Sequence, residues 1–228
     1  MTIAQTVGRQ LIVKGQSRSI ISEQYRTLRT NIKFSNTTKL QTLVVTSAVQ
    51  AEGKSTTAAN LAYLFAEEGQ NVLFIDADMR KPTVHFTFHL SNITGLSFVL
   101  SGQATLQDCI QQIEDTSLHV LTSGPIPPNP SEMLGSQAFH ALLQTAEQHY
   151  DWIIIDTSPV LAVTDAQVLA NRVDGTILVI DPTKSDKKMA KKAVSLLKKV
   201  DAHLLGVVLN NVEQNKDIYY YSEYVQSE

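Results

Sequence analysis

Six short runs of valine, isoleucine and leucine, separated by helical patterns, are the feature that most constrains how this chain folds. The runs are continuous rather than alternating, as is typical of strands covered on both faces. They lie at 42–47, 71–76, 118–123, 152–157, 175–181 and 204–210, and the helical patterns lie near 19–34, 54–68, 131–149, 164–172 and 185–200. This alternation predicts an α/β fold in which right-handed crossovers build a mostly parallel sheet with helices on both faces.

The size of the chain fits one domain built on such a sheet. With 228 residues it can bury a full core. Hydrophobic residues make up 43% of it and charged residues 18%, which indicates a globular protein rather than a disordered one. We divide the chain into an N-terminal segment with one helix (1–40), an α/β core (41–214) and a C-terminal tail (215–228).

Charge and cysteine content limit the partners and the compartment. The net charge of −3 argues against a generally basic nucleic-acid binder, so no nucleic-acid partner is expected. Cys109 is the single cysteine, which excludes an intrachain disulfide and fits a reducing cytosol. No apolar run approaches the roughly 20 residues of a membrane helix. We therefore expect a cytoplasmic chain that acts at a membrane only through a partner.

A phosphate-binding loop is predicted between the first strand and the helix that follows it. The segment reads AVQAEGKST, and a Gly-Lys-Ser-Thr in this context is the signal for such a loop. Gly53 lets the backbone approach phosphates, while successive N–H groups and the helix N-terminus stabilise negative charge. Lys54 is predicted to reach the β- and γ-phosphates, Ser55 to bind Mg²⁺ and Thr56 to contact the α-phosphate.

The loop departs from the strict motif G-x-x-x-x-G-K-[ST]. Ala48 stands where the motif has its first glycine, and residue 51 is also alanine. Because alanine resists positive φ, we expect the loop to keep an ordinary backbone there. The alternative is a chance Gly-Lys-Ser at a strand–helix turn.

Three aspartates follow the ends of predicted strands. Asp76 ends the second strand, Asp78 comes two residues later, and Asp156 ends another strand. Because ligands of open parallel sheets bind beyond the carboxyl ends of the strands, we expect these carboxylates to converge on one Mg²⁺–nucleotide. For each aspartate alone, capping of a turn is the alternative. Arg80 and Lys81 are assigned either to phosphate or a neighbouring subunit, or to solvent.

Five motifs in this order resemble those of the bacterial tyrosine kinases (BY-kinases) of the capsular and exopolysaccharide type. The resemblance is to the cytosolic chain that Firmicutes make separately from its membrane activator. The motifs are SAVQAEGKST, IDADMRKP, IIIDTSPV, a terminal tyrosine cluster, and SEQYRTLR with Glu23, Arg26 and Arg29. The family usually carries Pro-Gly where this chain has Gln50-Ala51, and a second proline where it has Val160.

The resemblance implies an ATP-dependent protein-tyrosine kinase that phosphorylates its own tail and regulates capsular or exopolysaccharide synthesis. The tail tyrosines are Tyr219, Tyr220, Tyr221 and Tyr224. A tail that orders by aromatic packing is the alternative. A tyrosine hydroxyl has a pKa near 10, so a carboxylate that accepts its proton late in transfer assists the reaction. The resemblance implies this role for Asp76 or Asp78, which the sequence does not separate.

The resemblance also implies roles for the other site residues. Lys54 offsets charge on the leaving β-phosphate. Asn210 and Asn211 end the last strand and contact adenine, although a strand-end turn explains them equally well. The predicted oxygen ligands of Mg²⁺ are Ser55, Asp78 and Asp156.

Assembly and recruitment are further implications of the resemblance. The resemblance implies a ring in which one helix of each subunit touches the next subunit and so presents the tails in trans. The residues of that contact are Glu23, Arg26 and Arg29. The alternative is an ordinary helix with a solvated face, whose packing residues are Ile20, Leu28 and Ile32. The expected partners are protein tyrosine substrates and the cytosolic tail of a membrane-spanning activator, which recruits the chain to the inner face of the membrane.

One more segment and one more aspartate can be interpreted from the sequence. Residues 124–131, GPIPPNPS, predict an ordered loop near the open end of the sheet, or a plain connector. Asp165 is interpreted as a helix cap, and the resemblance implies that its loop lies near the γ-phosphate side of the site.

Two other function classes remain open. One is a partition or septum-type ATPase that binds DNA or membrane, which the basic helix at 185–200 suits. Val49, where that group carries an early lysine, and the tyrosine-rich end argue against it. The other is a weakly catalytic adaptor that binds ATP only to assemble.

Overall fold

The computed structural model describes residues 11–35 and 40–212. The four tail tyrosines, Tyr219, Tyr220, Tyr221 and Tyr224, and the predicted tail segment 215–228 lie outside the described residues, so their predicted roles rest on the sequence.

In the described part of the chain, seven strands form one sheet in the order β3-β4-β2-β5-β1-β6-β7. Their bounds are β1 Thr42–Ser47, β2 Val72–Asp76, β3 Ile110–Gln112, β4 Leu118–Leu121, β5 Trp152–Asp156, β6 Gly175–Ile180 and β7 Leu204–Leu209. The pairs are parallel except β3 with β4, which confirms the predicted α/β fold. In the register of β2 with β5, Asp76 lies opposite Asp156.

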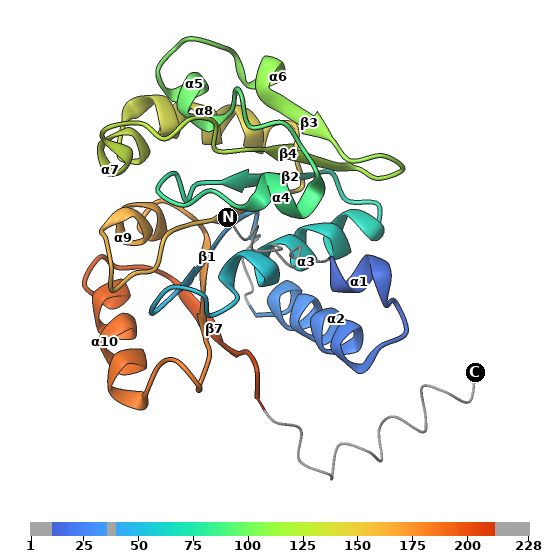
Figure 1. Cartoon of the computed structure of the whole chain (residues 1–228), viewed down its shortest axis with the longest axis vertical. Helices are drawn as coiled ribbons and strands as arrows, with labels where there is room; N and C mark the ends of the chain where they lie inside the picture. The colour runs from blue at the N-terminus through green and yellow to red at the C-terminus, as the bar shows by residue number, and fades with distance from the viewer. Residues whose placement is uncertain (1–10, 36–39, 213–228) are drawn as a thin grey trace, which may run out of the picture.

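Helices cover both faces of the central strands of this sheet, which is why these strands read as continuous apolar runs (Figure 1). The edge strand β7 differs from the prediction, because its Val207 and Leu209 are exposed. One face carries α1 Ile12–Gly15, α2 Ile20–Lys33, α3 Lys54–Glu67 and α4 Val84–Phe88. The other carries α5 Leu96–Leu100, α6 Leu106–Cys109, α7 Pro130–Leu134, α8 Gln137–Glu147, α9 Asp165–Ala170 and α10 Lys187–Lys198. Successive strand residues alternate between the two layers: Leu43 and Val45 face α3, and Val44 faces the α8 side.

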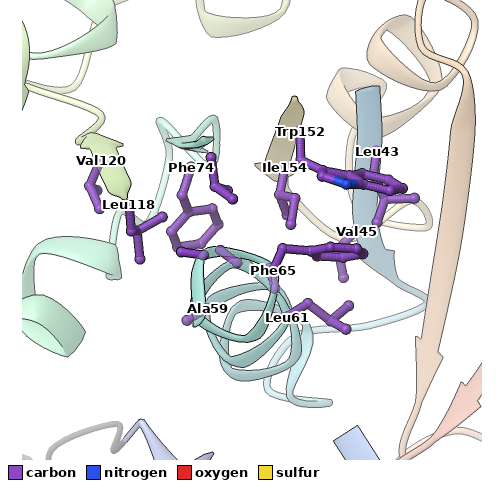
Figure 2. Packing of buried hydrophobic residues seen from close by; sticks show 14 of the residues in the cluster. Leu43, Val45, Ala59, Leu61, Phe65, Phe74, Leu118, Val120, Trp152 and Ile154 are labelled. Atoms are coloured by element: carbon purple, nitrogen blue, oxygen red, sulfur yellow. The ribbon is translucent and has the colours of Figure 1, made fainter. Parts of the chain in front are cut away.

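Helix α3 is the element that fixes the phosphate loop in place. Phe65 of α3 stacks on Trp152 at the start of β5, with ring centroids 4.2 Å apart, and lies among buried aliphatic side chains of β1 and β5 (Figure 2). The helix is buried along most of its length. Its N-terminus, where Lys54 lies, is therefore held against the carboxyl ends of the central strands.

The structure corrects the sequence analysis at several short elements. The helix predicted over 131–149 is two helices, because Ser136 caps a new helix by accepting a hydrogen bond from the backbone N–H of Phe139. The three-residue edge strand β3 and the short helices α1, α4, α5 and α6 were not predicted, since each is too short to show a period. No helix in the described ranges is long and apolar enough to cross a membrane.

Candidate active site

The phosphate loop lies between β1 and α3, as predicted. Gly53 is the N-cap of α3 and has a φ of 95°, a left-handed conformation that glycine adopts without strain. Glu52, which the sequence analysis missed, is fully buried. Its carboxylate accepts hydrogen bonds from the backbone N–H of Val49 at 2.8 Å and of Asp181 at 3.1 Å. Glu52 thus joins the loop to the end of β6.

The two alanines of the loop have different backbone conformations. Ala48 is fully buried and is absent from the described residues with positive φ, so the expected ordinary backbone holds there. Ala51 has a φ of 67°, so the same expectation is wrong at this position. The turn before Gly53 imposes a left-handed residue, which costs an alanine about 1–2 kcal/mol.

Ala51→Gly is therefore expected to raise the free energy of unfolding by about 0.5–1 kcal/mol, because glycine relieves the strain but gains freedom in the unfolded chain. Ala48→Gly, which restores the strict motif, is expected to lower it by about 1 kcal/mol, since it removes a buried methyl group. Urea unfolding of the two variants measures both. Equal signs for the two would contradict the assigned backbone conformations.

Lys54 brings the predicted acids together. Its Nζ lies 2.8 Å from Asp78 Oδ2, 3.2 Å from Asp156 Oδ1 and 3.1 Å from Ser55 Oγ. Burial opposes the charge on Lys54, but the carboxylates of Asp156 and Asp78 outweigh it and raise its pKa. In the structure Lys54 thus contacts two of the three strand-end aspartates that were expected to converge, Asp78 and Asp156.

Asp76 lies beneath this cluster. It is fully buried, and its oxygens accept hydrogen bonds from the backbone N–H of Asp78 at 3.2 Å and of Thr83 and Val84 at 3.0 Å. Burial, together with the nearby charge of Asp156, raises the pKa of Asp76 to about 7. Burial likewise raises the pKa of Asp156, against the opposing charge of Lys54. Asp76 shapes the loop that carries Asp78.

A cavity of about 520 Å³ opens above Lys54, a size within the usual range for a small-molecule site. Its walls combine the phosphate loop, the loop after β2 and the loop after β5. The lining includes Gly53, Lys54, Ser55, Thr56, Asp78 and Arg80. The predicted phosphate-binding residues thus face one cavity, and of the three strand-end aspartates only Asp78 lines it; Asp76 and Asp156 are fully buried behind it.

The oxygens beside this cavity fit a magnesium ion that binds mainly through phosphates and water. In the ranges that the structure describes, no group of three or more histidine, cysteine, aspartate or glutamate side chains could hold a metal ion alone. Mg²⁺ in nucleotide sites usually takes only one or two carboxylates and completes its shell with phosphate oxygens and water. The hydroxyl of Ser55 and the carboxylates of Asp78 and Asp156 are hard donors of that kind.

Asn210 and Asn211 lie on the other side of the loop. The side-chain N–H of Asn210 donates to the backbone oxygen of Glu52 at 2.9 Å, and that of Asn211 donates to Asp181 at 2.7 Å. Both line a second cavity, of about 510 Å³, between α2 and β7. Asn210 therefore holds the loop, Asn211 holds the residue that follows β6, and the adenine contact of both stays a prediction.

The two arginines of the α2 motif have different partners. Arg26 pairs with Glu23 one turn earlier and donates to the backbone oxygen of Ser17 at 2.9 Å. Arg29 turns toward α3, where it donates to the backbone oxygen of Leu64 at 3.0 Å and lies 2.7 Å from Glu68. Arg29 therefore holds α2 against α3 of the same chain.

The residues predicted to pack α2 against the core are buried to different extents. Ile32 is buried and Leu28 packs against the core, while Ile20 is 38% exposed.

Arg80 and Lys81 also have partners within the chain. Arg80 donates to both carboxylate oxygens of Asp165, at 2.8 and 3.1 Å. Asp165 is fully buried, and its side chain accepts these bonds rather than capping α9, so the capping interpretation is wrong. Burial alone would raise the pKa of Asp165, but the hydrogen bonds from Arg80 and Ser131 hold it below its ordinary value. Lys81 donates to Gln50 at 3.0 Å.

Comparison with known sequences identifies a family profile and several proteins that this chain resembles. The profile of a family described as an AAA domain matches residues 43–206. The tyrosine-protein kinase YwqD of Bacillus subtilis (strain 168) is 46% identical over 217 residues, which cover 95% of this chain and 90% of that protein. The tyrosine-protein kinase CpsD of Streptococcus pneumoniae serotype 4 is 38% identical over 192 residues, 84% of each chain.

Solved structures give the same grouping. The chimerical protein CapA2B2 superposes with a TM-score of 0.87 at 46% identity, over 90% of both chains. The kinase domain of Escherichia coli tyrosine kinase ETK gives 0.84 at 33% identity, over 90% of this chain and 82% of that one. The septum site-determining protein MinD of Pyrococcus horikoshii gives 0.64 at 23% identity, over 81% and 76%, which is a likeness of fold alone.

Proposed function

The chain belongs to the family of bacterial tyrosine-protein kinases, and from that premise we propose that it phosphorylates the tyrosines of its own C-terminal tail and thereby regulates capsular or exopolysaccharide synthesis. One observation carries the catalytic part of the proposal: Lys54 lies at the floor of a cavity with Asp78 and Asp156 beside it. The choice of the tail as substrate rests on the cluster of tyrosines between 219 and 224.

In the proposed reaction, the tyrosine oxygen forms a bond to the γ-phosphorus of ATP. The bond from that phosphorus to the oxygen shared with the β-phosphate breaks, and ADP leaves. Lys54, released from its acids by the phosphates, offsets the charge that develops on the leaving oxygen. Bound Mg²⁺ would neutralise charge on the β- and γ-phosphates, and Ser55 and Asp156 are the ligands that we assign to it.

We assign the tyrosine proton to Asp78. This carboxylate lines the cavity, whereas Asp76 is fully buried behind it and already accepts three backbone hydrogen bonds. A proton acceptor must come within hydrogen-bond reach of the hydroxyl that loses the proton. Of the two aspartates that the sequence left as alternatives, Asp78 has the position that supports this role.

The proposal includes transfer in trans within a ring. Between Val212 and Tyr224 the chain spans at most about 40 Å, enough to reach a neighbouring site. The paired Glu23 and Arg26 on α2 are the surface that we assign to the contact between subunits. Each phosphotyrosine adds about −1.5 to −2 charges, so phosphorylated tails would repel one another and loosen the ring.

Recruitment completes the proposal. A membrane-spanning activator would bind the kinase through its cytosolic tail and hold it at the inner face of the membrane. Tyrosines of other proteins would be further substrates there.

The test is to incubate the protein with labelled ATP and Mg²⁺, with and without the cytosolic tail of a candidate activator, and to map the label by mass spectrometry. We expect label on the four tail tyrosines and none on a variant that carries phenylalanine at all four positions. When that variant is mixed with Lys54→Met, transfer in trans predicts label on the Lys54→Met chain.

Each other outcome selects a different function. Free phosphate without labelled tyrosine would indicate a partition-type ATPase. Nucleotide binding with neither product would indicate an adaptor. Label on tyrosines outside the tail would keep the kinase but remove the tail as its substrate.

A further inference from the structure

We propose that Asp165 is a positioning residue for Asp78: it holds the loop after β2, which carries Asp78, against the loop after β5 and against α7. The inference rests on the proposed function of Asp78 and adds a residue that the phosphate loop and the strand-end acids do not include. The observation is that one fully buried carboxylate receives hydrogen bonds from two separate segments, through Arg80 and Ser131, and lies 3.3 Å from the hydroxyl of Ser158 on a third.

The first connection runs through Arg80, two residues after Asp78 on the same loop. Its Nε and Nη2 donate to the two oxygens of Asp165 at 2.8 and 3.1 Å. A two-point contact between a guanidinium and a carboxylate fixes direction as well as distance. The backbone that leads from Arg80 to Asp78 is thereby held at one end.

The second connection runs through Ser158 on the loop after β5. Its hydroxyl oxygen lies 2.7 Å from Asp78 Oδ1 and 3.3 Å from Asp165 Oδ2. A hydroxyl has one proton, and the shorter distance assigns that bond to Asp78. Because Asp165 already accepts from Arg80 and Ser131, it leaves the Ser158 proton to Asp78.

These contacts gain importance when nucleotide binds. Asp78 Oδ2 is held by Lys54 at 2.8 Å, but the proposed mechanism turns Lys54 toward the phosphates. Asp78 then keeps the bonds to Oδ1, from Ser158 at 2.7 Å and from the backbone N–H of Lys81 at 3.3 Å. Its direction during transfer would depend on the loop that Asp165 anchors.

The cluster also gives a role to the proline-rich segment. Pro130 starts α7, and the next residue, Ser131, donates to Asp165 and accepts from Arg80 Nη2 at 2.9 Å. Segment 124–131 therefore ends in a contact with the site rather than acting only as a connector. Because proline restricts the backbone, the segment presents Ser131 in a fixed position.

The test compares Asp165→Asn, Arg80→Lys and Ser131→Ala with the wild-type chain by two measurements. Hydrogen exchange followed by mass spectrometry reports how firmly residues 77–83 are held. Single-turnover formation of ADP, followed over a range of ATP concentrations, reports the maximal rate of transfer to tyrosine and to water alike, and the KM for ATP. Asp174→Asn is the matched control, because Asp174 is also a structural carboxylate but binds the backbone N–H groups of Gln41 and Thr42 at the other end of β1.

We expect Asp165→Asn and Arg80→Lys to speed hydrogen exchange in residues 77–83 about tenfold or more. Both variants should slow ADP formation by about 10- to 100-fold, because each loses a charge-assisted hydrogen bond. The KM for ATP should change less than about threefold. Ser131→Ala, which keeps the ion pair, should have the same effects on a smaller scale. Asp174→Asn should leave exchange in 77–83 and the rate unchanged.

Two results would overturn the inference: unchanged exchange in 77–83 in both Arg80→Lys and Ser131→Ala, or a KM that rises as far as the rate falls. If Asp165→Asn does not fold, these two variants decide the matter. Faster exchange in a chain whose wild type labels no tyrosine would refute the proposed function and support the anchoring of the loop.

Discussion

Replacing Lys54 with methionine is expected to slow tyrosine phosphorylation by at least about 100-fold, the usual cost of removing one group that stabilises charge in a transition state. Lys54 is the cation that lies between Asp78 and Asp156 at the floor of the cavity. Methionine removes the charge and keeps an unbranched side chain that is one heavy atom shorter. The measurement is the initial rate of label transfer to the tail. Lys188→Met, on the exposed face of α10, is the control and should keep the wild-type rate.

The same variant should lose stability in a pH-dependent way. Removing Lys54 leaves buried carboxylates without their cation, which typically costs about 3–5 kcal/mol at neutral pH. The pKa of Asp76, already about 7 beside Lys54, lies above its value in the unfolded chain. Between about pH 4 and 7 the folded state therefore binds more protons than the unfolded state, and stability falls as pH rises.

Urea unfolding at pH 5.5 and 7.5 tests this expectation, and the deficit of Lys54→Met should be smaller at the lower pH. An equal deficit at both values would mean that the acids are not coupled to the lysine.

Replacing Gly53 with alanine is expected to lower the affinity for Mg²⁺–ADP more than tenfold and the free energy of unfolding by about 1–3 kcal/mol. Two costs combine. The φ of 95° disfavours any residue with a Cβ, and that Cβ would lie 2.1 Å from Asn210 Nδ2. Asn210 would have to give up its bond to the backbone oxygen of Glu52. Titration calorimetry and urea unfolding measure the two effects.

Two further variants separate these costs. Gly69 has a φ of 80°, and no atom lies within 4 Å of a Cβ added there, so Gly69→Ala isolates the backbone cost. The double variant Gly53→Ala with Asn210→Ala removes the collision and should recover part of the loss. If Gly53→Ala cost no more than Gly69→Ala, contact with Asn210 would have no part in shaping the loop.

The sequence predicted the strands and the main helices because their signals are local. Continuous apolar runs, the glycine and lysine between a strand and a helix, and aspartates at strand ends can each be recognised within about ten residues. Strand ends in a parallel sheet share an edge, so Asp76, Asp78 and Asp156 were expected together. The short helices and the break at Ser136 were missed, since four or five residues carry no readable period.

What the sequence by itself determined is the layered α/β architecture, the position of the phosphate loop and the set of acids that gathers near its lysine, because periodicity and strand ends are properties of contiguous residues. Only the tertiary structure decided which polar side chains reach across: Glu52 to the end of β6, Arg29 to α3, and Arg80 and Ser131 to Asp165. These pairs depend on the strand order β2-β5-β1-β6, which brings distant loops side by side. Many donors and acceptors in the chain are chemically equivalent, and only the packing of the sheet and its helices selects among them.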